Sequence, residues 1–310
     1  MKAKYSIIVP VFNEQEAIPM FYEKIIPTME ALNEPFEIVF VNDGSRDNTL
    51  NVLRSLSEKD NRVKVLSFSR NFGQQAAIFC GLENASGDAM IPIDVDLQDP
   101  VEAIPMMIAK WKEGYDIVHG KRQKRKGETF FKKFTSKLYL KFIRSISGLD
   151  IPQNVGEFKL LDRKVVEVIR SMPEQDRYLR GIASWVGFKQ AEVEFIRNER
   201  VAGETKYSVK KLIRLATNSV TNLSTWPLTL SMKSGLIGGF LSVACFVTFI
   251  VLACCKIALP LTAWLFPTIG LLFSMTFVFN GLTNTYLKKT YHEVQNRPRY
   301  IVSEKMNIEE

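Results

Sequence analysis

The sequence predicts an α/β fold with a mostly parallel, doubly wound sheet, followed by a C-terminal hairpin of two transmembrane helices. Two observations lead to this prediction. Apolar runs of strand length alternate with helical segments in the N-terminal part of the chain, a pattern that favours a parallel sheet. Nearer the C-terminus, two long stretches carry no charged residue, as a membrane span requires.

Four apolar runs are expected to form buried strands, and a polar loop follows each of them. In order along the chain, the runs are YSIIVPV at 5–11, FEIVFV at 36–41, VKVLS at 63–67 and the run that leads into DVDLQDP at 94–100. In open α/β sheets the ligand crevice lies at the carboxyl ends of the strands. The four loops are therefore expected to line one ligand site.

The fourth run leads into three carboxylates, Asp94, Asp96 and Asp99. Side chains alternate along a strand, so Asp94 and Asp96 share a side and can reach one hard cation where the strand ends. An isolated Asp-x-Asp is usually a solvated acidic turn, but its place after a fourth strand favours a divalent metal bound to a diphosphate. Mg²⁺ or Mn²⁺ suits a ligand set of Asp94, Asp96 and Gln98, because these ions prefer oxygen.

Four motifs in this order, VPVFNE, VNDGSRDNT, SRNFG and DVDLQDP, resemble those of the inverting glycosyltransferases of family 2. That family has the nucleotide-diphospho-sugar transferase (GT-A) fold, a Rossmann-like domain. The resemblance continues through NVGEFKLLDRKVV, RGIASWVGFKQ and ERVAGETKY to YHEVQNRPRYIV. This whole pattern is similar to the bactoprenol (undecaprenyl-phosphate) glucosyltransferases and to dolichol-phosphate mannose synthase. It implies transfer of a hexose, above all glucose, from a UDP-sugar to undecaprenyl phosphate with inversion, for cell-surface glycan modification.

The resemblance assigns the nucleotide pocket to residues from these loops. It implies that Asp43 accepts a hydrogen bond from the uracil ring. Asp43 could instead cap the next helix, a role that Ser45 or Asp47 fits better. The full set implied for nucleotide binding, in which Ser69 and Arg70 would close over the nucleotide, is Pro10, Phe12, Glu14, Asp43, Ser69, Arg70 and Asp94.

A basic segment, GKRQKRKGETFFKKFTSK at residues 120–137, mixes lysine and arginine with three phenylalanines. A charge run of this kind is usually a solvated loop. The resemblance instead implies that this segment binds the acceptor phosphate. A mobile loop formed by ERVAGETKY would contribute to this binding. The two basic residues of that loop could also be ordinary surface charges. The implied acceptor-phosphate set is Arg122, Lys132, Ser136, Arg200 and Lys206.

Glu157 occupies the position of an aspartate in the family motif G-D-F-R-L, which reads GEFKL here. The family residue is placed beside the acceptor as a base or an orienting group, so the implied catalytic residues are Asp94, Asp96 and Glu157. A glutamate extends the carboxylate by one methylene, and a shift of about 1 Å can cost on the order of a hundredfold in rate. Lys159 replaces a bidentate arginine by a point charge, and Gln74 replaces the lysine common after RNFG.

Two apolar stretches, Ser234–Cys255 and Ile257–Leu287, contain no charged residue. About 20 apolar residues cross ~30 Å of hydrocarbon, and buried helices of a soluble core normally keep a polar face, which these stretches lack. Lysine and arginine flank the pair on both outer sides, so the positive-inside rule places both ends in the cytoplasm. The expected location is the bacterial inner (cytoplasmic) membrane, with the catalytic domain cytoplasmic.

The predicted organisation has four parts. They are a catalytic domain at 1–206, amphipathic juxtamembrane helices at 207–232, two transmembrane helices at 233–287 and a cytoplasmic tail at 288–310. Segment 207–232 fits a helix lying flat on the lipid bilayer and an ordinary domain helix equally well. Polar residues in the second span can hydrogen-bond either between helices or between subunits. A homo-oligomer is therefore expected from Asn280, Asn284 and Thr285.

The net charge of +8 fits either nucleic acid or an anionic membrane face. Basic residues beside apolar spans favour the membrane, and no nucleic-acid-binding motif is recognisable. Three classes of function remain: a polyprenyl-phosphate sugar transferase using UDP-glucose, UDP-N-acetylglucosamine or another donor; a processive polysaccharide synthase; and a non-catalytic nucleotide-sugar-binding protein. Two spans make a poor polymer channel, the Q-x-x-R-W motif of processive enzymes is absent, and intact metal carboxylates argue against a sensor. The transferase is the leading hypothesis.

Overall fold

The computed structural model describes residues 4–123, 155–175, 177–196 and 262–308, with scattered residues between 237 and 255. The chain divides into two compact units. Residues 1–207 and 298–310 form the first unit, and residues 208–297 form the second. Both ends of the chain therefore belong to the unit that carries the predicted strands.

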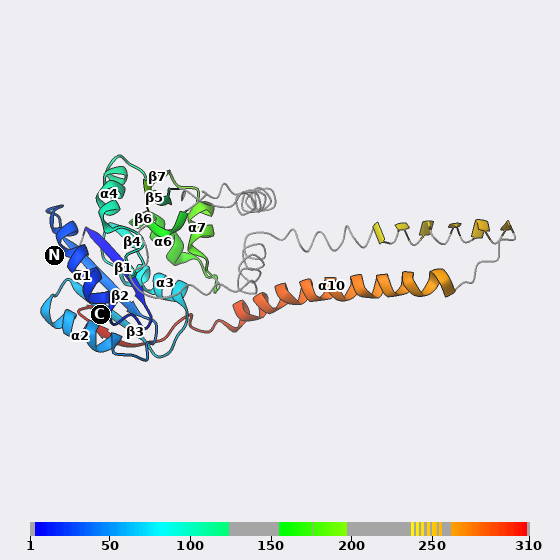
Figure 1. Ribbon diagram of the computed structural model, residues 1–310, viewed down its shortest axis with the longest axis horizontal. Coiled ribbons are helices and arrows are strands. Elements are labelled where there is room, and N and C mark those ends of the chain that lie inside the picture. The colour runs from blue at the N-terminus through cyan, green and yellow to red at the C-terminus, as the bar shows by residue number, and fades with distance from the viewer. Residues whose placement is uncertain are drawn as a thin grey trace. The chain divides into compact units, whose positions relative to one another are not determined.

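The first unit is built on an eight-stranded sheet with the strand order β7-β5-β6-β4-β1-β2-β3-β8 (Figure 1). The strands are β1 (Tyr5–Val11), β2 (Phe36–Asn42), β3 (Val63–Phe68), β4 (Ala89–Pro92), β5 (Ile117–Arg122), β6 (Val155–Asp162), β7 (Gln190–Phe195) and β8 (Val302–Met306). Strands β1 to β4 run parallel, as do β5 and β7, whereas β6 and β8 are antiparallel to their neighbours. The predicted mostly parallel sheet is confirmed.

Helices cover both faces of this sheet. One face packs against α1 (Ala17–Glu30), α2 (Thr49–Lys59), the short 3₁₀ helix η1 (Val101–Ala103) and α4 (Ile104–Lys112). The other face packs against α3 (Gln74–Asn84), α6 (Arg163–Ser171) and α7 (Leu179–Trp185). Side chains alternate along a strand, so Ile7 and Val9 of β1 enter the first layer and Ile8 enters the second.

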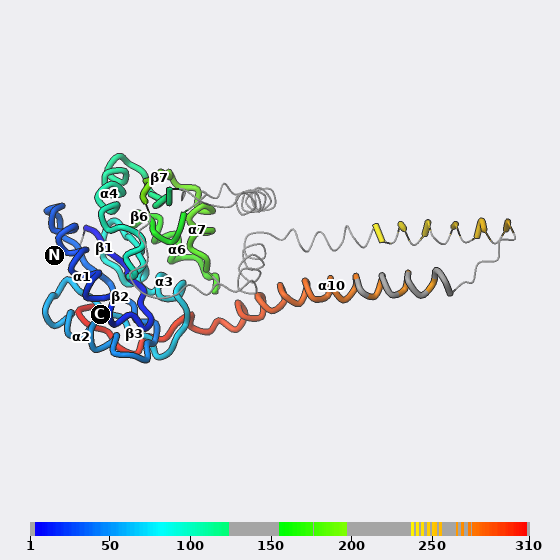
Figure 2. Tube along the Cα trace, viewed as in Figure 1, coloured from blue at the N-terminus to red at the C-terminus, as the bar shows by residue number. Residues whose placement is uncertain are grey.

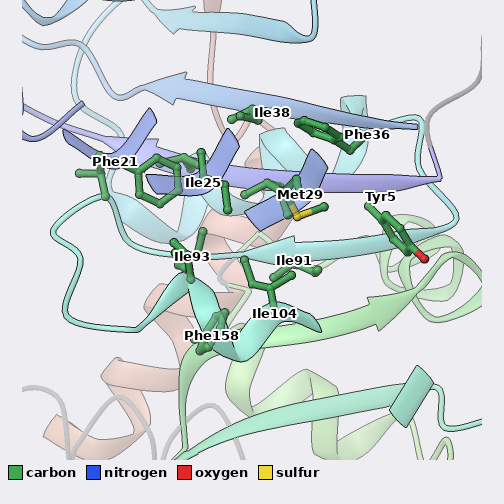
Figure 3. Close-up of a cluster of buried hydrophobic side chains, with 14 of the residues drawn as sticks. Tyr5, Phe21, Ile25, Met29, Phe36, Ile38, Ile91, Ile93, Ile104 and Phe158 are labelled. Atoms are coloured by element: carbon green, nitrogen blue, oxygen red, sulfur yellow. The ribbon is translucent and has the colours of Figure 1, made fainter. Parts of the chain in front are cut away.

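The first layer forms a core of aliphatic and aromatic side chains, part of which is drawn in Figure 3. Phe21 of α1 packs edge-on against Phe40 of β2, with 6.2 Å between the ring centres. Every residue of β1 and β2 is buried, as is typical of central parallel strands covered on both faces. The loops that follow these strands therefore start from rigid positions.

The order of the strands reverses at β1. The chain first runs from β1 to β2 and β3, and then crosses to the other side of β1 to form β4. The carboxyl end of β1 is therefore a topological switch point, where open α/β sheets bind ligands. Residues 12–14, 43–46, 69–73 and 94–99 follow the four strands at this edge.

The C-terminal residues return to the first unit as an edge strand. β8 pairs antiparallel with β3, with Leu66 opposite Lys305, and Figure 2 shows the red C-terminal trace beside β3. Two hydrogen bonds of 3.0 and 2.7 Å join the Arg54 guanidinium to the Glu304 carboxylate. The predicted tail thus contains a strand that was not expected from the sequence, and this strand covers the otherwise open edge of β3.

The second unit contains α10 (Thr262–Gln295), a helix of 34 residues. It covers most of the second predicted span, Ile257–Leu287. The juxtamembrane segment 207–232 and much of the first span lie outside the described residues. In the ranges that the structure describes, no helix combines the length and the apolar character needed to cross a membrane.

Candidate active site

The loops after β1 and β2 are tied to each other at the switch point. The backbone N–H of Asn13 donates to Oγ of Ser45, and Oδ1 of Asn13 accepts from the backbone N–H of Arg46, both at 2.9 Å. Asn13 has a φ of 56°, which asparagine tolerates better than most residues. This arrangement places Phe12, whose side chain is exposed, and Glu14 directly after β1, at the carboxyl edge of the sheet. Pro10, also predicted to contact the nucleotide, is buried in β1.

Asp43 connects the loop after β2 to the loop after β3. Its carboxylate is buried and accepts the backbone N–H groups of Phe72 at 2.6 Å and Gly73 at 2.9 Å. Burial raises the pKa of Asp43, and these two hydrogen bonds oppose the rise. Gly44 has a φ of 65°, and a Cβ there would lie 2.3 Å from the backbone carbonyl carbon of Arg70. The two loops therefore approach each other so closely that position 44 requires glycine.

The hydrogen bonds described for Asp43 join it to the loop after β3 and not to the start of α2. Asp47 accepts the backbone N–H of Thr49 at the start of α2, as the sequence favours. Asp43 holds the loop that carries Ser69 and Arg70, both of which are exposed. The Arg70 guanidinium lies 4.0 Å from the ring centre of Phe72. Contact of these residues with a uracil or a nucleotide stays a prediction.

The carboxylates of the fourth motif project from a turn. β4 ends at Pro92, and Leu97 adopts a φ of 57°. Within the turn, Oδ1 of Asp96 accepts the backbone N–H of Gln98 at 3.1 Å. Oδ1 of Asp94 accepts the side-chain amide of Gln74 at 2.7 Å, from the first residue of α3. Gln74, which the sequence predicts on the donor side as a departure from the family motif, thus contacts a residue of the carboxylate turn.

Asp94 is surrounded by like charges. Its pKa is raised to about 7, first by burial and then by the negative charges of Asp96, Asp99 and Glu157, while Arg122 opposes the rise. Carboxylates crowded in this way favour either a proton or a cation. Among the described residues, no group of three or more His, Cys, Asp or Glu side chains is arranged to hold a metal ion by itself.

Two residues expected on the acceptor side are described, and both lie near the carboxylate turn. The Arg122 guanidinium, at the end of β5, donates to both carboxylate oxygens of the buried Asp99 at 3.2 Å. Glu157, on β6, has its Oε1 atom 3.7 Å from the Arg180 guanidinium on α7. The sequence predicts neither the Arg122–Asp99 pair nor Arg180, because both contacts join segments that are remote along the chain. Lys132, Ser136, Arg200 and Lys206 lie outside the described residues.

Comparison with known proteins identifies the family. The model of glycosyl transferase family 2 matches residues 6–170. The prophage bactoprenol glucosyl transferase homolog of Escherichia coli is 42% identical over 316 residues, with 96% of this chain and 98% of that protein covered. The SfII prophage-derived bactoprenol glucosyl transferase of Shigella flexneri is 41% identical over 301 residues, with 96% and 97% covered. The uncharacterized glycosyltransferase YkcC of Bacillus subtilis is 42% identical over 310 residues, with 99% and 95% covered.

Solved structures agree on the fold. Glucosyl-3-phosphoglycerate synthase from Mycobacterium tuberculosis, in complex with phosphoglyceric acid, gives a TM-score of 0.52 at 19% identity, with 71% of this chain and 79% of that chain covered. Its complex with Mn²⁺, UDP-glucose and phosphoglyceric acid gives 0.51 at 18% identity, with 71% and 78% covered. The GT-A-like fold is thereby confirmed. Because the family model matches more than half of the chain and relatives match nearly all of it, this protein belongs to glycosyl transferase family 2 and is a glycosyltransferase.

Proposed function

We propose that this enzyme transfers glucose from UDP-glucose to the phosphate of undecaprenyl phosphate, with inversion at the anomeric carbon. Support comes from relatives named as bactoprenol glucosyl transferases that match almost the full length. The observation in the site that carries the proposal is the buried position of Asp94 among other carboxylates, because burial and then their negative charges raise its pKa to about 7. That negative charge suits a crevice that a cation and a sugar diphosphate complete.

The residues of the turn fit Mg²⁺ or Mn²⁺. Asp94 and Asp96 offer carboxylate oxygens and Gln98 offers an amide oxygen, and these ions favour such ligands. Two carboxylates leave coordination positions for phosphate oxygens and water, which is how Mg²⁺ is commonly bound. Bound there, the ion would supply positive charge against the charge that develops on the leaving diphosphate.

The nucleotide would lie along the edge formed by the first three loops. Exposed Phe12 and Arg70 frame this edge, and Asp43 stabilises it through the backbone of residues 72 and 73. A carboxylate has about four acceptor positions, and two protein N–H groups leave room for a further donor such as the uracil N–H. Asp43 would therefore both hold the loop and read the base, with Pro10, Glu14 and Ser69 beside it.

The acceptor phosphate would enter from the side of β5 and β6. The second pKa of a phosphate monoester is about 6, so a lipid phosphate is largely ionised at neutral pH and needs little help from a base. Its main obstacle is repulsion by the donor diphosphate. Glu157 would orient the acceptor, and basic residues would offset the repulsion. The proposed set is Arg122, Lys132, Ser136, Arg200 and Lys206.

A membrane hairpin would hold this site at the surface where the lipid phosphate lies. The chain enters the second unit after Tyr207 and returns to the first unit at Pro298, so any membrane crossings between them must be even in number. Large apolar side chains of α10 are exposed, among them Phe273, Phe277 and Val278, and exposed apolar surface of this kind suits contact with lipid. We propose two spans in the bacterial inner membrane, with the first unit in the cytoplasm.

The reaction is tested by incubating purified full-length protein with radiolabelled UDP-glucose, undecaprenyl phosphate and Mn²⁺. Formation of a lipid-soluble product that mild acid converts to free glucose is the expected result. UDP-N-acetylglucosamine and UDP-galactose in parallel reactions identify the preferred sugar. A water-insoluble polymer would instead indicate a processive synthase, and absence of any product would contradict the proposal.

The membrane topology is tested with single cysteines in a chain whose four native cysteines are changed to serine. A cysteine at Lys256, between the two proposed spans, should react with a membrane-impermeant maleimide in intact cells. A cysteine at Glu293 should react only after the inner membrane is opened. Equal labelling of both positions in intact cells would contradict the hairpin.

A further inference from the structure

Lys159 is a fully buried lysine in β6, on the same face of the strand as Glu157. Within the part of the chain that the structure describes, neither its ammonium nor Oε2 of Glu157 has a hydrogen-bond partner. Buried polar atoms are almost always hydrogen-bonded, and a buried charge needs an opposite charge nearby. The placement of a lysine here therefore calls for a physical explanation.

Among the described residues, ionisable groups near Lys159 come from β6, α7 and β5. On the same strand, the negative charge of Glu157 favours the protonated form of Lys159. From α7, Arg180 acts on Lys159 and lies 3.7 Å from the Glu157 carboxylate. On β5, His119 is opposite Lys159 in the sheet register, and its Nε2 atom lies 2.8 Å from the Gln190 side chain on β7. Burial, followed by the charge of Lys159, lowers the pKa of His119 to about 4, so its ring is neutral at pH 7.

The Glu157 carboxylate therefore interacts with two cations, Lys159 and Arg180. Toward the carboxylate turn, the same Glu157 raises the pKa of Asp94, so like charges repel it from that side. Without a cation behind it, the Glu157 carboxylate would be pushed away from the carboxylate turn by these like charges.

We infer that Lys159 is a positioning residue whose ammonium, with Arg180, directs the Glu157 carboxylate toward the acceptor. This inference rests on the proposed function, in which Glu157 orients the lipid phosphate. Lys159 touches no substrate in this scheme and acts through Glu157. The role differs from that of an arginine, because a lysine can lose its charge in the working pH range of an enzyme.

The pH dependence follows from burial. Burial lowers the pKa of Lys159 to about 8, with Glu157 opposing the change and Arg180 adding to it. The ammonium is therefore present below pH 8 and is lost above it. As the pH rises through this value, Glu157 loses one of its two cations and turnover should fall.

The test compares kcat from pH 6.5 to 9.5 in wild-type protein, Lys159→Arg and Lys159→Met. We expect wild-type kcat to fall by up to about tenfold per pH unit above pH 8, and the fall to vanish in Lys159→Arg, whose side chain stays protonated. In Lys159→Met, kcat at pH 7 should drop about tenfold to a hundredfold, while the KM for UDP-glucose changes little. An unchanged alkaline fall in Lys159→Arg, or full turnover in Lys159→Met, would overturn the inference.

A second measurement keeps the inference testable if one variant folds poorly or if no substrate is turned over. The lowered pKa of Lys159 means that the unfolded chain binds more protons than the native state between pH 8 and 10.5, so wild-type stability should rise with pH in this interval. The unfolding temperature of Lys159→Met relative to wild type should therefore fall from pH 7.5 to pH 10. No such trend would overturn the inference.

Lys164→Met provides a matched control, because Lys164 is an exposed lysine on α6. Its side chain is paired with Asp116, away from the carboxylate turn, and the variant should keep the wild-type pH profile. If wild-type protein glycosylates no lipid phosphate but shows the stability trend, the proposed function fails and the buried titration of Lys159 stands. If transfer occurs and the pH profile of Lys159→Arg matches wild type, only the inference fails.

Discussion

Gln74 donates its side-chain amide to Oδ1 of Asp94 across 2.7 Å, from the first residue of α3 to the carboxylate turn. This neutral donor stands where the family motif, by the resemblance described above, implies a lysine. An ammonium at 74 would attract the Asp94 carboxylate and compete with a metal ion for it. The amide fixes the orientation of the carboxylate without that competition.

Replacement of Gln74 by alanine should weaken donor binding moderately. A single hydrogen bond contributes about 1 kcal/mol, so the KM for UDP-glucose should rise about fivefold, with kcat less affected. Gln74→Lys should instead raise the Mn²⁺ concentration needed for half-maximal activity. Initial-rate measurements over a grid of donor and Mn²⁺ concentrations distinguish these outcomes, and identical Mn²⁺ requirements in all three proteins would contradict the assigned contact.

Binding of Mn²⁺ together with UDP should depend on the protonation of Asp94. Because its pKa is raised to about 7, the metal must displace a proton at lower pH. The affinity should rise about tenfold per unit between pH 5.5 and 6.5 and level off above pH 7.5. Isothermal titration calorimetry in two buffers of different ionisation heat would detect the released proton. A pH-independent affinity would show that Asp94 is already ionised in the free enzyme.

The same raised pKa predicts the stability of an asparagine variant. The native state holds a proton on Asp94 that the unfolded chain releases from about pH 4 upward, so ionisation of Asp94 costs stability as the pH approaches 7. Relative to wild type, Asp94→Asn should gain stability when the pH rises from 4 to 7 in the absence of metal. Thermal unfolding at both pH values checks the sign, and the Asp94→Asn protein should also lose most transfer activity.

Loss of the Arg122–Asp99 ion pair should lower the free energy of unfolding. Asp99 is buried and Arg122 is partly exposed, so Arg122→Ala leaves a buried carboxylate without its cation. We expect a loss of about 2–3 kcal/mol, below the range for a fully buried pair because of that exposure, whereas Arg122→Ala with Asp99→Asn should lose less than the sum of the single changes. Chemical unfolding of wild type, the two single variants and the double variant completes this double-mutant cycle. Strict additivity would mean that the contact contributes nothing.

Tyr300 links the C-terminal strand to the nucleotide side of the site. Its ring stacks on Phe68 with 5.0 Å between centres, and its hydroxyl donates to Glu83. Phe68 leads directly into Ser69, whose backbone N–H donates to the carbonyl oxygen of Ile301. Tyr300→Ala should cost about 2–4 kcal/mol and should raise the KM for UDP-glucose, because the loop after β3 loses its support.

Tyr300→Phe is the matched control for this change. It keeps the stacked ring and removes only the hydroxyl, so its KM for UDP-glucose should stay near the wild-type value and its stability should fall by about 1 kcal/mol. Thermal unfolding and donor kinetics on both variants give the comparison. A normal KM in folded Tyr300→Ala protein would show that β8 stabilises the sheet without influencing the donor site.

Glu157→Gln should lower turnover far more than donor affinity, since the side chain is assigned to the acceptor and keeps nearly the same shape. A loss of about 10²-fold or more in kcat is expected for a positioning or base role. Glu157→Asp, which restores the aspartate of the family motif, is the informative companion. Equal losses in kcat and in the affinity for UDP-glucose would contradict the assignment.

Much of the donor side follows from local sequence. The runs that become β1 and β2 are apolar throughout, and each is followed by polar residues, so their strand character and the position of Phe12 and Asp43 at the strand ends can be read directly. The family motifs then add the expected chemistry. Position along a parallel strand is enough here, because all such strands end at the same edge of the sheet.

Contacts between remote segments could not be predicted in the same way. Asp43 is visible in the sequence, but its bonds to the backbone of Phe72 and Gly73 depend on how closely two loops approach. Lys159 is visible as a departure from an arginine, yet its burial depends on the packing of α7 over β6. The edge strand at 302–306 has a weakly alternating pattern, and its partner β3 is more than two hundred residues earlier in the chain.

The amino-acid sequence by itself determined the family, the parallel strand–helix alternation and the carboxylate motif, because these depend on short segments and on their order. Only the tertiary structure decided which polar and charged side chains interact: Gln74 with Asp94, Arg122 with Asp99, and Lys159 with Glu157. The reason is physical, since the pKa of a side chain depends on burial and on the charges within a few ångströms of it. Those neighbours come from different strands and helices, and the folded sheet brings them together.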